Sequence, residues 1–280
     1  MRMSYRFAIW GSCLLATLFL LTQPVNAQGI FGQSPAKATL MAQQSSIQPG
    51  STMTVGVLLT PDEGWHTYWI NPGESGLPTK ITWELPDGFT AGDIQWPTPH
   101  TFETGGIIGL GYGGPVLLTV PITAPKSISQ NSVTLKAKAS WLVCKEACIP
   151  GRASLSIVLP VKNVTPAIDP ANKKLFADTI NHLPKPIELK SDQASVRDGQ
   201  LKLTLPNLTV SDAVFYSANE SLIDTDSKQT VTVNTSNQTT TITVPLSKYA
   251  PKTITRITGV VVADPHAKVS KAYAIDMVIK

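Results

Sequence analysis

The chain has 280 residues, a formal net charge of +4 and a hydrophobic content of 42%. That hydrophobic content is ample for a buried core, so the fold does not depend on disulfide bonds for its stability. No run of basic residues stands out, which argues against nucleic acid or anionic lipid as a partner. After the N-terminal segment no stretch of roughly eighteen apolar residues follows, so the sequence predicts a soluble mature chain.

The first 27 residues have the features of a secretory signal peptide. Arg2 and Arg6 form a basic region, an apolar run follows, and residues 25–27 supply the small side chains of a cleavage site. We expect cleavage there and a secreted, periplasmic mature protein. Cys13 should leave with the signal, and because the signal holds two arginines and no acid, the net charge should fall from +4 to +2.

Most of the mature chain has the period-two alternation of half-buried strands. Residues 133–143 place apolar side chains on one face and polar ones on the other, and residues 153–161 do the same. The second half of the chain contains further alternating runs, at residues 200–206, 229–235, 240–246 and 271–280. Short alternating strands with little helix predict an all-β fold of two antiparallel β-sandwiches.

One segment between the alternating runs has helical spacing. Asp169 is suited to cap a helix, Pro170 suits the first helical position, and Pro184 should stop the helix. All tryptophans lie before residue 142, so the composition also changes along the chain. We therefore expect a first sandwich over residues 28–162, a linker with a short helix over 163–184, and a second sandwich over 185–280.

The two cysteines expected in the mature chain, Cys144 and Cys148, bracket a three-residue loop at the end of a predicted hairpin. Opposed loop ends bring two Cα atoms within disulfide range, so the pair should bond in an oxidising compartment. One interpretation is a structural disulfide, although closing so small a loop stabilises a protein by only ~2 kcal/mol. A second is a Cu(I) site with His66, His100 or a methionine. The third is a redox-active pair, since small disulfide rings are more easily reduced.

Three segments carry a resemblance to a known family: "GWHTYWINPGESGLPTKITWELPDGF", "IQWPTP" and "VTLKAKASWLVCKEACIPG". Together they resemble the periplasmic N-terminal domain of the DsbD thiol:disulfide interchange proteins, most closely the branch that includes the copper-sensitivity suppressor proteins. The resemblance covers roughly residues 37–160, and the second half resembles the companion β-domain of that branch. The best-studied members separate their cysteines by five residues, whereas this chain and the copper-linked branch have three.

The resemblance implies an immunoglobulin-like sandwich whose redox pair is Cys144 and Cys148, with no bound cofactor or metal. Reducing equivalents would come from a membrane-embedded thiol donor, here on a separate chain. They would pass to a periplasmic disulfide isomerase or to a thioredoxin-like protein of cytochrome c maturation. Because Cys148 lies past the loop, we expect it to react with the partner and Cys144 to resolve. The alternative function is a non-enzymatic copper- or protein-binding module with a structural disulfide.

Residues 102–115 form a glycine-rich segment. Gly109, Gly111 and Gly114 match G-x-G-x-x-G, but a strand-like run follows where a dinucleotide site needs a helix, so nucleotide binding is not expected. We interpret the segment as a mobile loop. In the resembled family an aromatic cap loop shields the cysteines, and Phe102 and Tyr112 are the candidates here.

The aromatic cluster that contains His66, residues 65–69, is interpreted as core packing. His66 is expected to be a satisfied polar group there and not a base.

Overall fold

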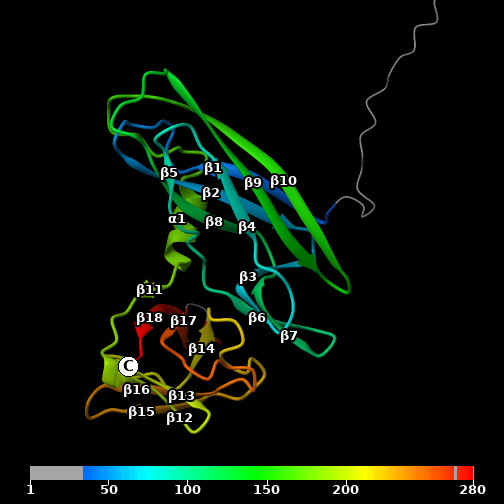
Figure 1. The fold of residues 1–280 in the computed structure, drawn as a ribbon, viewed down its shortest axis with the longest axis vertical. Coiled ribbons are helices and arrows are strands. Elements are labelled where there is room, and N and C mark those ends of the chain that lie inside the picture. The colour runs from blue at the N-terminus through cyan, green and yellow to red at the C-terminus, as the bar shows by residue number, and fades with distance from the viewer. Residues whose placement is uncertain (1–33, 268–269, 280) are drawn as a thin grey trace, which may run out of the picture. The chain divides into compact units, whose positions relative to one another are not determined.

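The computed structural model describes residues 34–267 and 270–279 (Figure 1). The predicted signal peptide lies outside the described residues. Among those residues, no helix is long and apolar enough to cross a membrane.

The N-terminal half is a sandwich of two antiparallel sheets. One sheet has the order β1-β2-β8-β5, and the other has the order β10-β9-β3-β7-β6 with β4 added to β9. Its strands are β1 (Ala36–Ala42), β2 (Thr52–Pro61), β3 (His66–Gly73), β4 (Lys80–Glu84), β5 (Thr90–Ala91), β6 (His100–Thr104), β7 (Ile107–Tyr112), β8 (Val116–Thr123), β9 (Ser132–Cys144) and β10 (Cys148–Pro160).

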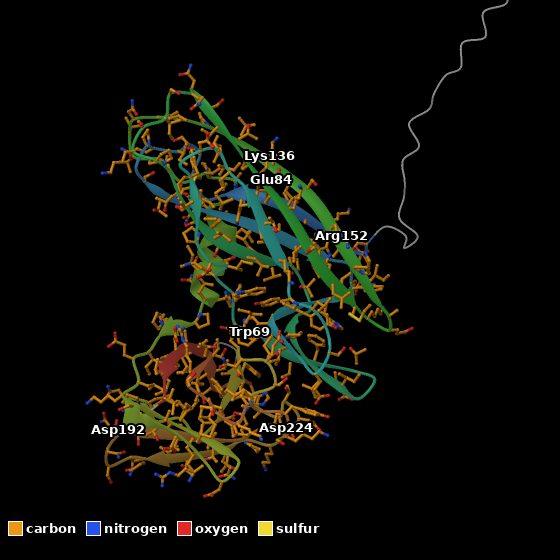
Figure 2. The ribbon with its side chains drawn as sticks, in the orientation of Figure 1. Trp69, Glu84, Lys136, Arg152, Asp192 and Asp224 are labelled. Atoms are coloured by element: carbon orange, nitrogen blue, oxygen red, sulfur yellow. A yellow bond between two sulfur atoms is a disulfide. The ribbon has the colours of Figure 1, made fainter. Side chains whose placement is uncertain are left out.

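The alternation of β9 decides which face of its sheet meets the core. Its odd-numbered residues from Val133 to Val143 are buried, and its even-numbered residues from Ser132 to Lys138 are exposed. The outer face is charged along most of its length: Figure 2 marks Glu84, Lys136 and Arg152 along β4, β9 and β10. Because side chains alternate along a strand, Cys144 belongs to this outer face and not to the core face.

The helix expected between the two halves is present as α1 (Lys173–His182), but it begins later than predicted. The carboxylate of Asp169 accepts a hydrogen bond from the backbone N–H of Ala171 at 2.9 Å, which closes a turn ahead of the helix. The N-cap position is therefore Asn172, whose side chain donates to the carbonyl of Ala42 instead of capping the helix.

The C-terminal half is a second sandwich with its own apolar core. One sheet has the order β11-β18-β17-β14 and the other β12-β13-β16-β15; all pairs are antiparallel except β11 with β18. The elements are β11 (Lys185–Pro186), η1 (Ser191–Gln193), β12 (Ala194–Arg197), β13 (Gln200–Pro206), β14 (Ala213–Ser217), β15 (Thr230–Asn234), β16 (Thr239–Pro245), β17 (Arg256–Ala263) and β18 (Lys271–Val278). The predicted all-β class with a short connecting helix is confirmed, whereas the exact domain boundaries stay predictions.

Candidate functional site

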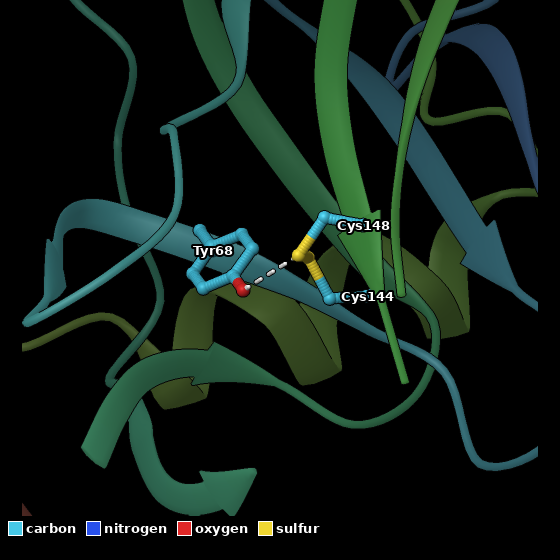
Figure 3. Close-up of a disulfide and its surroundings, with 3 residues drawn as sticks. All are labelled: Tyr68, Cys144 and Cys148. Atoms are coloured by element: carbon cyan, nitrogen blue, oxygen red, sulfur yellow. Dashed lines mark hydrogen bonds between the residues drawn. A yellow bond between two sulfur atoms is a disulfide. The ribbon is translucent and has the colours of Figure 1, made fainter. Parts of the chain in front are cut away.

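Cys144 and Cys148 form a disulfide across the end of the β9–β10 hairpin (Figure 3). Cys144 is the last residue of β9 and Cys148 the first of β10, and the two lie directly opposite each other with Cα atoms 4.1 Å apart. The intervening turn is closed by the N–H of Lys145, which donates to the carbonyl of Ala147 at 3.2 Å. The hairpin loop of three residues is as the sequence predicts.

The two cysteine residues differ in their exposure to solvent. Cys144 is 1% exposed, whereas Cys148 is exposed. The sheet order explains the difference: β9 lies between β10 and β3, while β10 is an edge strand with a neighbour on one side only. Cys148 is therefore the more accessible of the two residues.

Two side chains of β3 share the outer face with the cysteines. Thr67 lies opposite the core-facing Val143 and Trp69 is part of the core, so His66 and Tyr68 point the other way. His66 lies directly opposite Cys144 in the register. The hydroxyl of Tyr68 lies 3.9 Å from Sγ of Cys148, within hydrogen-bond range for sulfur (Figure 3).

Phe102 of β6 completes an aromatic cluster with these two residues. Its ring centroid is 3.7 Å from that of His66 and 5.6 Å from that of Tyr68. Phe102 lies opposite Gly109 of β7, and a Cβ added at Gly109 would stand 2.3 Å from a carbon of the Phe102 ring. The missing side chain at Gly109 therefore lets the ring cross β7 and reach β3.

The glycine-rich segment is a paired hairpin and not the expected mobile loop. β6 and β7 pair in register from His100–Gly111 to Thr104–Ile107. The turn between them is Gly105-Gly106, with φ of 61° and 81°. Positive φ at both central residues is the requirement of a type I′ hairpin turn, which Gly-Gly meets without strain. The glycines from which the sequence predicts a mobile loop include the two that close this hairpin.

Tyr112, the second predicted shielding residue, lies on the wrong face for that role. It pairs with Thr67, is buried in the core, and its hydroxyl donates to the carbonyl of Pro97 at 2.8 Å. Phe102 and Tyr112 are on opposite faces of the sheet because the β6–β7 register places Phe102 beside Gly109, three residues from Tyr112. The residue beside Phe102 at the disulfide is Tyr68.

Burial sets the protonation of both polar rings at the site. Burial lowers the pKa of His66, which favours the neutral imidazole, and raises the pKa of Tyr68, which keeps its hydroxyl protonated. Nε2 of His66 is buried and has no hydrogen-bond partner. The expectation that His66 is a satisfied polar group is therefore wrong.

Among the described residues, no group of three or more His, Cys, Asp or Glu side chains is placed to hold a metal ion. His100, the other histidine considered for a copper site, is an exposed residue of the edge strand β6. At the cysteines, a disulfide spans the end of the β9–β10 hairpin. Cys144 is buried, Cys148 is exposed, and the phenol of Tyr68 contacts Sγ of Cys148.

Comparisons with known proteins find a likeness for the part of the chain that holds these cysteines. Residues 36–160 match the family model described as "Thiol:disulfide interchange protein DsbD, N-terminal". The matched residues include both cysteines and support a thiol:disulfide interchange domain there. Among the curated proteins, no sequence matches the chain significantly.

Solved structures extend the likeness in fold beyond that segment. The N-terminal periplasmic domain of ScsB from Proteus mirabilis superposes with a TM-score of 0.59 at 22% identity, covering 92% of this chain and 96% of that one. At this identity the likeness shows the fold, here of both sandwiches. The major pilin subunit BcpA of Bacillus cereus, as its D312A variant, has a TM-score of only 0.27 at 10% identity, covering 87% of this chain and 67% of that one.

Proposed function

We propose that the first sandwich relays reducing equivalents in the periplasm through Cys144 and Cys148. It would accept electrons from a membrane-embedded thiol donor. It would pass them to a periplasmic disulfide isomerase or thioredoxin-like protein. The observation that carries the proposal is the unequal exposure of the two disulfide-bonded cysteine residues, in a segment that matches an interchange family.

The exchange runs through a mixed disulfide and needs no bound cofactor. In the reduced domain, the thiolate of Cys148 attacks one sulfur of the partner's disulfide, and the other partner sulfur leaves as a thiolate. Cys144 then attacks Sγ of Cys148, which forms the bond seen here. The bond between Cys148 and the partner breaks, and the partner sulfur that was attacked first leaves as a thiolate. The domain loses two electrons and two protons, and the partner's disulfide becomes a dithiol.

Tyr68 supports the first step. When the pair is reduced, its hydroxyl is placed to donate a hydrogen bond to the Cys148 thiolate, because it already lies 3.9 Å from that sulfur. Burial raises the pKa of Tyr68, so the donor proton is retained at neutral pH. A hydrogen bond to a charged acceptor is worth about 1.5–3 kcal/mol, enough to increase the thiolate fraction of Cys148.

Phe102 limits access to the sulfurs. Its ring covers His66 and Tyr68 on the outer face, where solvent or an unspecific thiol would approach. The β6–β7 hairpin that carries it is at the sheet edge opposite β10, held to the domain by β3 on one side only. A partner that displaces this hairpin tip would uncover His66 and Tyr68 beside the disulfide.

The reduction potential of the pair tests the proposal. The protein is equilibrated with a series of glutathione buffers that differ in redox potential. Free thiols are then alkylated, and the fraction of protein with the disulfide is measured by mass spectrometry. The proposal predicts a potential within the range of exchange proteins, from about −270 to about −120 mV. A potential below about −300 mV would mark a structural disulfide and favour the alternative of a non-enzymatic binding module.

A further inference from the structure

Three side chains stand in a row across the end of the sheet. Cys144 on β9 lies directly opposite His66 on β3 and directly opposite Cys148 on β10. Residues directly opposite in an antiparallel pair point to the same face, with Cβ atoms about 4.5–5.5 Å apart. The imidazole and both sulfurs therefore share the outer face, with Cys144 in the middle.

The imidazole of His66 lacks a partner in the oxidised protein. His66 is 6% exposed, and its Nε2 has no hydrogen-bond partner although a buried polar atom without one is costly. Sulfur in a disulfide carries no proton and cannot donate to this nitrogen. Reduction changes that, because it places an S–H group on Cys144, directly across from the ring.

Cys144 needs a proton acceptor to complete the exchange. Only a thiolate attacks a disulfide, and burial in apolar surroundings disfavours the thiolate. Cys144 is 1% exposed, so water has little access to take its proton. Tyr68, the other polar ring on this face, contacts the sulfur of Cys148.

We propose that His66 is the general base that deprotonates Cys144 when it resolves the mixed disulfide. This inference rests on the proposed exchange function. Nε2 takes the proton of the Cys144 thiol, and the thiolate attacks Sγ of Cys148. The Cys144–Cys148 bond forms, the bond from Cys148 to the partner breaks, and its electron pair leaves on the partner's sulfur. That thiolate then takes up a proton, from the imidazolium or from solvent.

The other titratable groups near the row do not replace His66. Lys145 and Glu146 of the turn are exposed, and Nζ of Lys145 lies 3.1 Å from where a Cβ would stand on Gly64. His100 and Glu103 of β6 are exposed. β7 contributes Ile107, Gly109 and Gly111 to this face, and none of them titrates. The charged residue of β10 is Arg152, which is exposed and lies further along the strand.

A single-turnover reaction with oxidised glutathione tests the proposal. The reduced full chain is mixed with the probe, the reaction is quenched with acid, and the glutathione adduct and the intramolecular disulfide are followed by mass. In the wild type the adduct should resolve without accumulating. In His66→Gln it should accumulate, with resolution slower on the order of 100-fold and adduct formation little changed. His266→Gln, an exposed histidine of the second sandwich, should match the wild type.

The pH profile of resolution separates a base from a structural residue. With the base present, the rate should be flat above neutral pH and fall below it. Without the base, the rate should rise about tenfold per pH unit, because hydroxide must generate the thiolate. His66→Phe keeps a ring against Phe102 and provides a second variant if glutamine destabilises the sheet. A β-sheet circular dichroism spectrum like that of the wild type checks that each variant is folded.

Resolution at the wild-type rate in both folded variants would overturn the role of His66. A wild-type protein that forms the adduct but never the intramolecular disulfide would instead overturn the exchange function itself, and with it this inference.

Discussion

The hydroxyl of Tyr68 lies 3.9 Å from Sγ of Cys148, the more exposed sulfur of the disulfide. This contact predicts that Tyr68→Phe weakens the nucleophile while keeping the ring. The pH at which thiolate absorbance appears in the reduced protein should rise by about one unit, because a charge-assisted hydrogen bond is lost. Ultraviolet titration of the Cys144→Ser variant measures this for Cys148 alone. An unchanged titration would show that the hydroxyl does not reach the thiolate.

Shielding by Phe102 predicts faster chemistry at the exposed sulfur when the ring is removed. In reduced Phe102→Ala, alkylation of Cys148 by iodoacetamide should be severalfold faster, because the cover over His66 and Tyr68 is gone. The matched control is Tyr112→Phe, which loses only the core hydrogen bond to Pro97. That variant should lose about 1 kcal/mol of unfolding free energy and alkylate like the wild type. Equal rates in Phe102→Ala and the wild type would argue against the shield.

Gly109 offers a second test of the same cover without touching an aromatic residue. A Cβ at Gly109 would stand 2.3 Å from the Phe102 ring, so Gly109→Ala should push the ring off the site and speed alkylation as Phe102→Ala does. Gly113→Ala is the control, since nothing lies within 4 Å of an added Cβ there. If Gly109→Ala leaves the rate unchanged, the ring is not held by that contact.

Much of the fold could be predicted from the sequence because strand alternation is a local pattern. Patterns among neighbouring residues predict three features: the two faces of β9, the hairpin loop between the cysteines, and the connecting helix. The helix begins later than the sequence predicts, because Asp169 can cap a helix or close a turn and in the folded chain it closes a turn.

The rest of the site could not be predicted because it depends on register between distant strands. The residues near His66 in sequence do not predict that it lies opposite Cys144. In the same way, the sequence around Tyr68 does not predict that its hydroxyl reaches Cys148 on another hairpin. The alternation of residues 66–69 could predict one part of the site. It places His66 and Tyr68 on the face opposite to the core-facing Trp69. The face of the sheet on which Tyr112 lies could not be predicted either, because it depends on the pairing of Tyr112 with β3.

The buried imidazole predicts a pH dependence of stability. Burial lowers the pKa of His66, so the unfolded chain binds a proton at a higher pH than the folded one. This contribution is fully present above the ordinary value of 6.5 and is lost as pH falls through the folded pKa. Between about pH 7 and about pH 5 the unfolding free energy of the oxidised protein should fall, and in His66→Gln it should fall less. Identical pH dependence in denaturant unfolding would contradict a buried neutral His66.

Trapping with single serine variants tests the central claim most directly. Each reduced variant is exposed to periplasmic extract or to a purified disulfide isomerase, and adducts are resolved on non-reducing gels and identified by mass. The exposed Cys148 should attack and the buried Cys144 resolve, so Cys144→Ser should accumulate a mixed disulfide that dithiothreitol releases, and Cys148→Ser should not. An adduct only in Cys148→Ser would reverse the roles, and no adduct in either variant would contradict the relay.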